Sequence, residues 1–214
     1  MRLSAGEAVT LFNGRGGEYP GRIASIERLR ISVDVLEHRA IEREAPLRVA
    51  LVQAVSAGER MDFTVRKAVE LGVAEIQPLV AARSVARPKG ERADSRRAHW
   101  QKVAISACEQ CGRNRIPTVH PLVADAAAYR APGGDDVRKI LLSPQAELRF
   151  SQACNPGSGG VILAAGPEAG FTAQEEAAFV DAGFVPVRLG PRVLRTETAA
   201  LAALAALNAL AGDF

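Results

Sequence analysis

The spacing of hydrophobic and polar positions changes near residue 46. Before that point apolar and polar residues alternate, which predicts short strands at residues 22–26 and 31–36. Asn13-Gly14 follows another alternating stretch and is typical of a hairpin turn. After residue 46, continuous apolar runs take turns with amphipathic stretches, as in a parallel sheet covered by helices. We therefore predict a small β module at residues 1–45 and an α/β domain at residues 46–214.

The second domain contains five apolar runs and five stretches with helical spacing. The runs predict strands at residues 47–52, 76–80, 137–142, 161–165 and 184–188. The helical stretches are at residues 61–71, 96–111, 148–153, 172–182 and 196–210. Thr172 and Glu175 have the spacing of a capping box, Gly72 follows the first helix, and Thr196 is a good N-cap residue. Because strands and helices alternate, the predicted sheet is parallel.

The last helix is apolar nearly all round, since residues 199–210 are alanine and leucine except for Asn208. A surface helix would show a polar stripe. We therefore expect this helix to be covered by its own sheet and by a second subunit, which predicts a homodimer.

Charge is unevenly distributed along the chain. The net charge is +3, but residues 83–115 hold nine basic and three acidic residues. Such a local excess either forms a solvated charged face or binds phosphate groups, as in RNA. Aromatic residues make up only 5% of the chain, which disfavours base-stacking platforms. With no apolar run that could span a bilayer and no signal peptide, we expect a cytoplasmic protein without a membrane partner.

The three cysteines are too few for a disulfide scaffold and favour a reducing compartment. Cys108 and Cys111 form a C-x-x-C at a helix end, on the same face as Trp100. A redox pair would stand at a helix N-terminus, and a zinc site lacks further ligands nearby. We interpret both as structural cysteines and expect no metal. Cys154 lies far away in the sequence.

Three loops that follow predicted strands carry the candidate chemistry. They are residues 143–144, residues 166–170 and residues 189–195, and each contains glycine or proline. Ligands of parallel α/β sheets bind beyond the carboxyl ends of the strands, so these loops can form one pocket of mostly main-chain groups. Arg192 and Arg195 lie beside a helix N-terminus, which favours an anion. A phosphate loop and a Rossmann glycine motif are both missing from the sequence.

Two of these loops resemble a known signature. Residues 166–171 are Gly-Pro-Glu-Ala-Gly-Phe, and residues 189–199 are Leu-Gly-Pro-Arg-Val-Leu-Arg-Thr-Glu-Thr-Ala. Together they resemble the RsmE family of bacterial 16S ribosomal RNA uridine-N3 methyltransferases, in the SPOUT superfamily. Residues 13–17, 66–73 and 107–113 extend the resemblance over most of the chain.

The resemblance implies a fold, a cofactor and partners. The fold is a PUA-like β-barrel for RNA, followed by an α/β domain with a C-terminal trefoil knot that holds S-adenosylmethionine (SAM). The partners are 16S rRNA in the small ribosomal subunit and a second copy of the chain. Two departures stand out: Ala169 replaces a usual glycine and would be strained at positive φ, and we expect the β module to lack the first part that family members carry.

The site residues are assigned on this basis. Expected cofactor-binding residues are Leu142, Ser143, Ala165, Gly166, Pro167, Glu168, Leu189, Gly190, Arg192, Val193, Leu194 and Thr198. Expected RNA-binding residues are Arg2, Arg15, Arg22, Arg87, Lys89 and Arg113. Expected catalytic residues are Arg192, Arg195 and Glu197.

The expected chemistry is methyl transfer to N3 of a uridine, which needs no metal because a sulfonium methyl group is already activated. Arg192 or Arg195 would stabilise the uracil anion or hold a flanking phosphate. Glu168 and Glu197 are both candidates for the base. The alternative from another class is a non-catalytic RNA-binding assembly factor with the same fold, and a redox protein is a more distant one.

Overall fold

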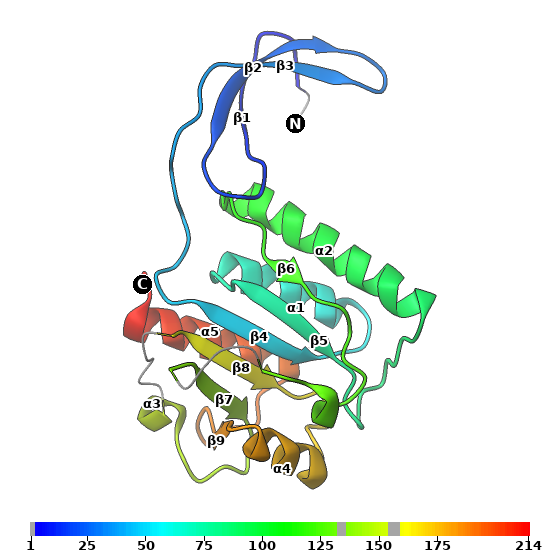
Figure 1. The fold of residues 1–214 in the computed structure, drawn as a ribbon, viewed down its shortest axis with the longest axis vertical. Helices are drawn as coiled ribbons and strands as arrows, with labels where there is room; N and C mark the ends of the chain where they lie inside the picture. Colours follow the sequence, from blue (N-terminus) through cyan, green and yellow to red (C-terminus); the bar gives the residue numbers. More distant parts are fainter. Residues whose placement is uncertain (1–2, 132–135, 154–158) are drawn as a thin grey trace. The chain divides into compact units, whose positions relative to one another are not determined.

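A computed structural model describes residues 3–131, 136–153 and 159–214. The chain divides into two compact units (Figure 1). The first comprises Met1–Glu44 and Cys108–Ile116, and the second comprises Ala45–Ala107 and Pro117–Phe214. The first unit therefore takes in a segment from the middle of the chain, which the change of pattern near residue 46 does not indicate.

The first unit contains a three-stranded antiparallel sheet among its described residues. Its strands are β1 (Ala8–Leu11), β2 (Tyr19–Ile26) and β3 (Ile31–Val35), in that order. The described residues of this unit add only isolated bridges, such as Glu18 with Arg39, so they form an open sheet. Gly14 lies in the β1–β2 connection at φ 81°, which glycine adopts readily.

The second unit is built on a parallel sheet, as the alternation of strands and helices predicts. The strand order is β6-β5-β4-β8-β7-β9, and every neighbouring pair is parallel. The strands are β4 (Val49–Ala54), β5 (Glu75–Leu79), β6 (Thr118–Val119), β7 (Arg138–Leu142), β8 (Val161–Ala165) and β9 (Val185–Val187). The sequence pattern missed β6, because two residues are too few to show a periodicity.

The helices follow the predicted order with shifted ends. They are α1 (Glu59–Glu70), α2 (Glu91–Cys111), α3 (Phe150–Ala153), α4 (Ala173–Asp181) and α5 (Thr196–Ala211), with a 3-10 turn η1 (Ala126–Ala128). Helix α2 begins five residues before its predicted start, in a polar stretch that looks like a loop in the sequence. The capping box of Thr172 and Glu175 is confirmed, and Gly72 follows α1 at φ 79°.

Helices cover both faces of this sheet. Helix α5 contacts α1, β4 and β8, and Figure 1 shows α5 beside α1. On the other face, Val52, Leu141 and Ile162 share a buried cluster with the aromatic rings of Tyr129, which follows η1, and of Phe171, Phe179 and Phe184. Phe179 lies at the centre of these rings, 5.0 Å from the ring centroids of both Phe171 and Phe184. None of the helices in the described residues has the length and apolar character needed to cross a bilayer.

The strand register brings three loops to the same level. Leu142, the last residue of β7, pairs with Ala165 at the end of β8 and with Val187 at the end of β9. The loops that follow β7, β8 and β9 therefore leave the same edge of the sheet side by side.

Candidate active site

The three loops surround one cavity of about 340 Å³. Most of the residues that line it come from the carboxyl ends of β7, β8 and β9 and from the loops beyond them, whereas Arg83 precedes α2, Glu176 is in α4, and Thr196 and Ala199 are in α5. The lining residues are Arg83, Leu142, Ser143, Pro144, Gln145, Ala165, Gly166, Pro167, Glu168, Ala169, Gly170, Phe171, Glu176, Val187, Leu189, Gly190, Arg192, Val193, Leu194, Thr196 and Ala199. The expected convergence of these loops on one pocket is therefore what the structure shows.

Two glycines leave main-chain groups open to this cavity. A Cβ atom on Gly166 would lie 3.2 Å from both the ring and the backbone nitrogen of Phe171, so Phe171 would have to shift slightly to admit a side chain. Gly190 has φ 118°, which residues with a Cβ rarely adopt. Gly166 thus allows close packing against Phe171, and Gly190 allows the backbone conformation of its loop, while both residues line the cavity.

Thr196 fixes the start of α5 to the Gly166 loop. Its side chain is 6% exposed, and its hydroxyl donates a hydrogen bond to the carbonyl oxygen of Gly166. The same hydroxyl accepts a hydrogen bond from Nε2 of Gln53 on β4, at 3.0 Å. The prediction that Thr196 is an N-cap is wrong, because the cap residue is Arg195 and its side chain makes no capping bond. The hydroxyl instead forms its hydrogen bonds with Gly166 and Gln53, which are distant in the sequence.

Glu168 connects the wall of the cavity to the beginning of α1. Its Oε1 accepts hydrogen bonds from the backbone nitrogen of Ala57, at 3.1 Å, and from Nη1 of Arg60, at 3.0 Å. Burial acts to raise the pKa of Glu168, but backbone N–H groups and the Arg60 guanidinium outweigh it, so the pKa lies below its usual value. Glu168 is therefore ionised at neutral pH and already engaged by donors.

Arg83 holds the same loop from the opposite end. Its Nη1 donates to the carbonyl oxygens of Ala169, at 3.1 Å, and Phe171, at 3.2 Å. Ala169 itself is not strained, because no non-glycine residue in the described chain has positive φ, and Gly170 carries that conformation at 70°. The replacement of glycine by Ala169 is thus accommodated without cost to the backbone.

Most of the expected cofactor-binding residues line the cavity, and Thr198 does not. Of the expected catalytic residues, Arg192 lines it and is exposed, whereas Arg195 and Glu197 do not line it. The lining residues that are absent from the expected cofactor-binding set are Arg83, Pro144, Gln145, Ala169, Gly170, Phe171, Glu176, Val187, Thr196 and Ala199. Phe171 belongs to the quoted motif and was within reach of the argument. Arg83 and Glu176 come from other segments, and only the folded chain brings them here.

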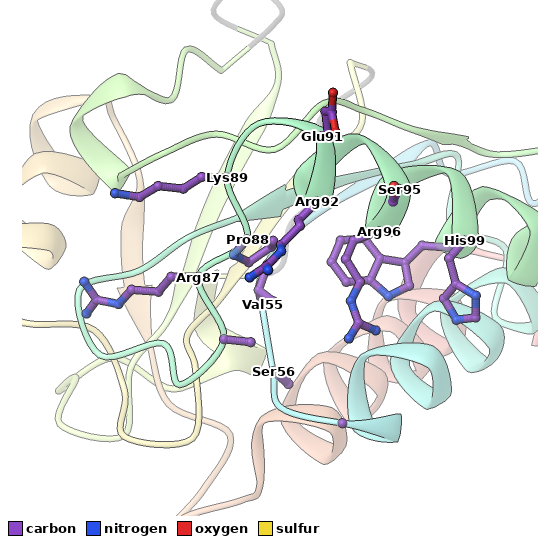
Figure 2. Close-up of a pocket in the computed structure, with 13 residues that line it drawn as sticks. Val55, Ser56, Arg87, Pro88, Lys89, Glu91, Arg92, Ser95, Arg96 and His99 are labelled. Atoms are coloured by element: carbon purple, nitrogen blue, oxygen red, sulfur yellow. The ribbon is translucent and has the colours of Figure 1, made fainter.

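The expected RNA-binding residues separate into different environments. Arg15 and Arg22 are exposed in the first unit, and Arg2 lies outside the described residues. Arg87 and Lys89 line a second cavity in the second unit (Figure 2). Arg113 needs a correction: it is 5% exposed, and its guanidinium forms a two-point ion pair with Glu44. The ion pair joins two segments of the first unit, and the buried guanidinium of Arg113 is not exposed to RNA.

The cysteines have the structural character expected of them. Cys108 is buried at the end of α2 and Cys111 is half-buried, and both are free. Burial raises the pKa of Cys108 to about 11, which is unsuited to a redox thiol. Cys154 lies outside the described residues. Within the described residues, His, Cys, Asp and Glu side chains form no group that could hold a metal ion.

Two family models match the chain: an RNA methyltransferase domain at residues 43–208 and an RNA methyltransferase PUA domain at residues 1–36. The ribosomal RNA small subunit methyltransferase E of Buchnera aphidicola, subspecies Acyrthosiphon pisum, is 32% identical over 214 residues. The alignment spans 100% of this chain and 84% of that protein. The chain belongs to the ribosomal RNA small subunit methyltransferase E family.

Solved structures agree with this membership. The methyltransferase E of Neisseria gonorrhoeae, bound to S-adenosyl methionine, is 40% identical with a TM-score of 0.91, covering 99% of this chain and 86% of that one. A methyltransferase of Legionella pneumophila, in complex with SAM, is 37% identical with a TM-score of 0.90 and the same coverage. The resemblance drawn from the motifs and the PUA-like character of the first unit are confirmed.

Proposed function

We propose that this methyltransferase E family member transfers a methyl group from SAM to N3 of a uridine in 16S ribosomal RNA, within the small ribosomal subunit. One observation carries the proposal. The carboxyl ends of β7, β8 and β9 lie in register and open into a single cavity of about 340 Å³, built largely from main chain. Two relatives with TM-scores of 0.90 or more were solved with SAM.

The residues of the cavity fit this cofactor. The volume is within the range of small-molecule sites, and apolar side chains such as Leu142, Val187 and Leu194 alternate with open backbone at Gly166 and Gly190. Apolar walls suit an adenine ring, and main-chain groups suit its edge and the ribose. The lining residues that the sequence predicts, from Leu142 to Leu194, are therefore our candidates for holding SAM, and Thr198 stays a prediction without a place in the wall.

When bound, SAM supplies a methyl group that its sulfonium has already activated. The chain then has to hold the uracil N3 in line and to favour loss of its proton. Arg192 lines the cavity without a carboxylate partner in the described residues, so it is placed to stabilise the uracil anion or a flanking phosphate. Arg195 is exposed at the N-cap of α5 and is the second candidate for that role.

The base is the less defined role. Glu168 is poorly suited to it, because its pKa is lowered and its Oε1 already accepts two hydrogen bonds. Glu197 is the remaining candidate. Its Oε2 is buried and has no hydrogen-bond partner in the described chain. Glu197 does not itself line the cavity, but it is the residue next to Thr196, which does.

Two finer features belong to the same proposal. We infer a homodimer because Leu201, Ala202 and Ala205 of α5 are only partly covered within one chain, whereas Leu204 and Leu207 are buried. We also infer the SPOUT-type trefoil knot, which is supported by the motifs and by the anchoring of Thr196 under the Gly166 loop. Sedimentation should give twice the 22.6 kDa of one chain, and a monomer at micromolar concentration would contradict the dimer.

The function is tested with the purified protein, SAM and small ribosomal subunits that lack the modification. Calorimetry should show SAM binding, and reverse transcription of the treated 16S rRNA should stop beside one uridine, because an N3 methyl group blocks base pairing. Gly190→Val should abolish both results, since valine is strained at φ 118°. SAM binding without any methylated uridine would instead favour the non-catalytic assembly factor.

A further inference from the structure

A larger cavity of about 1050 Å³ lies in the second unit, between the β4–α1 turn and the N-terminal half of α2. We call it the α2 groove. Its lining residues are Val55, Ser56, Gly58, Ala86, Arg87, Pro88, Lys89, Glu91, Arg92, Ser95, Arg96, His99 and Trp100. Figure 2 shows these side chains around the space between the turn at Ser56 and helix α2.

The groove concentrates positive charge. It is lined by three arginines and a lysine, with Glu91 as the one carboxylate among the lining residues. Arg92 and Arg96 extend from α2 toward the turn, while the carboxylate of Glu91 points the other way (Figure 2). Neither Arg92 nor Arg96 forms an ion pair or hydrogen bond within the described residues. Unpaired cations that converge on a hollow attract an anion.

The walls of the groove are fixed before any ligand binds. Asp62 on α1 accepts a hydrogen bond from Nε1 of Trp100, at 3.1 Å, and lies 2.7 Å from Nε2 of His99. These contacts fasten α2 to α1. Arg92 and Arg96 are one helical turn apart, about 6 Å along the axis, so each can meet a different phosphate. The helix backbone that carries both arginines is therefore held in place by contacts with α1.

The groove adjoins the candidate cofactor cavity. Glu168 lines that cavity and accepts a hydrogen bond from the backbone of Ala57, whose neighbours Ser56 and Gly58 line the groove. The hydrogen bond between Glu168 and Ala57 thus links the walls of the two spaces. A strand whose target base entered the cofactor cavity would therefore carry its neighbouring phosphates toward the groove.

We propose that the α2 groove binds the phosphodiester backbone of the RNA strand beside the target uridine, with Arg92 and Arg96 as its phosphate contacts. The proposal rests on the proposed function, because it takes the nearby cavity to be where the uridine is methylated. Trp100 is 2% exposed and so cannot stack on a base. The groove accordingly positions the strand and does not read its sequence.

The test measures the salt dependence of RNA binding. Fluorescence anisotropy with a fluorescein-labelled oligouridylate is recorded over a series of salt concentrations for the wild type and for Arg92→Ala/Arg96→Ala. Loss of two phosphate contacts on a single strand should reduce the slope of log K against log salt by about 1.4, and weaken binding at low salt by about tenfold or more. SAM affinity, measured by calorimetry, should stay within about twofold of the wild type.

Lys102→Ala is the matched control, since Lys102 is also exposed on α2 but does not line the groove. This control measures how much one positive charge on the surface of α2 contributes to RNA affinity without a contact in the groove. An equal loss per charge for Lys102→Ala and for the arginine variant would overturn the proposal. Displacement of the oligonucleotide by micromolar 5′-UMP would also overturn it, because the groove would then hold a free nucleotide.

The small subunit provides the last readout. If the arginine variant binds naked RNA as the wild type does and loses affinity only for the assembled subunit, the groove contacts a ribosomal protein and the proposal is wrong. Failure of the proposed function looks different: the wild type would bind SAM and RNA but leave every uridine unmethylated, whatever the state of the groove.

Discussion

Replacement of Thr196 by valine tests the anchor between α5 and the cofactor loop. Valine has nearly the shape of threonine, so the change removes a hydroxyl from a site that is 6% exposed without leaving a cavity. Two hydrogen bonds disappear: the one donated to the carbonyl oxygen of Gly166 and the one accepted from Nε2 of Gln53. Gln53 keeps its bond to the carbonyl oxygen of Ala54, at 3.0 Å.

The magnitude follows from these contacts. A buried hydrogen bond contributes about 1 kcal/mol net, and a carbonyl left without its donor costs somewhat more. The free energy of unfolding of Thr196→Val should therefore fall by about 2–3 kcal/mol. In a chain of this size, that lowers the thermal unfolding midpoint by roughly 4–12 °C. Since the freed loop carries much of the cavity wall, SAM affinity should fall by about three- to tenfold.

The assay pairs thermal unfolding with calorimetric titration of SAM, for Thr196→Val and for Thr196→Ser. Serine keeps the hydroxyl and loses a methyl group, so it should cost about 1 kcal/mol in stability and leave SAM affinity close to the wild type. If the two variants behave alike in both measurements, the hydroxyl does not hold the loop and the argument fails.

Three other predictions concern charge, thiol reactivity and packing. Because the pKa of Glu168 lies below the usual 4.5, the ionised carboxylate stabilises the folded protein above pH 4.5, and this stabilisation is lost as the pH falls through the lowered pKa. The thermal unfolding midpoint should therefore decrease less between pH 6 and about 3 in Glu168→Gln than in the wild type. An identical pH profile for the two proteins would contradict this. Cys108, with its pKa raised to about 11, should resist iodoacetamide at pH 8 in the native protein and react only after urea is added, as followed by mass spectrometry; rapid native labelling would refute its burial. Phe179→Ala should cost about 3–5 kcal/mol in urea unfolding because the ring is 1% exposed among three other rings, whereas Val180→Ala at 47% exposure should change stability by no more than about 0.5 kcal/mol; equal losses would argue against the aromatic cluster.

The strand pattern of the second unit was largely predictable, and the helix ends were less so. The run at residues 161–165 is β8 to the residue, because a strand covered on both faces is continuously apolar. Helix α2, by contrast, begins at Glu91, in a stretch where solvent-facing charges hide the helical period. The two-residue strand β6 and the turn η1 depend on tertiary contacts, so no local pattern announces them.

The site was predictable where it is made of backbone. Gly166 and Gly190 mark the cavity in the sequence, since a glycine after a buried strand indicates a close approach of the main chain. Side-chain roles were harder. Threonine is a common N-cap residue, but the hydroxyl of Thr196 donates a hydrogen bond to Gly166. Arginine is a common RNA-binding residue, but Arg113 forms an ion pair with Glu44. In both cases a partner distant in sequence decides the role, and composition cannot reveal it.

The carboxylate of Glu168 has a thermodynamic consequence for the order in which ligands associate. It belongs to the wall of one binding space and holds the turn that borders the other. If ligand binding in one space moves the Glu168 carboxylate, the other space changes with it. Thermodynamic linkage then requires that SAM changes the affinity for RNA by the same factor by which RNA changes the affinity for SAM. Titrating each ligand with and without the other measures this ratio of affinities directly. In Glu168→Gln the ratio should be closer to one.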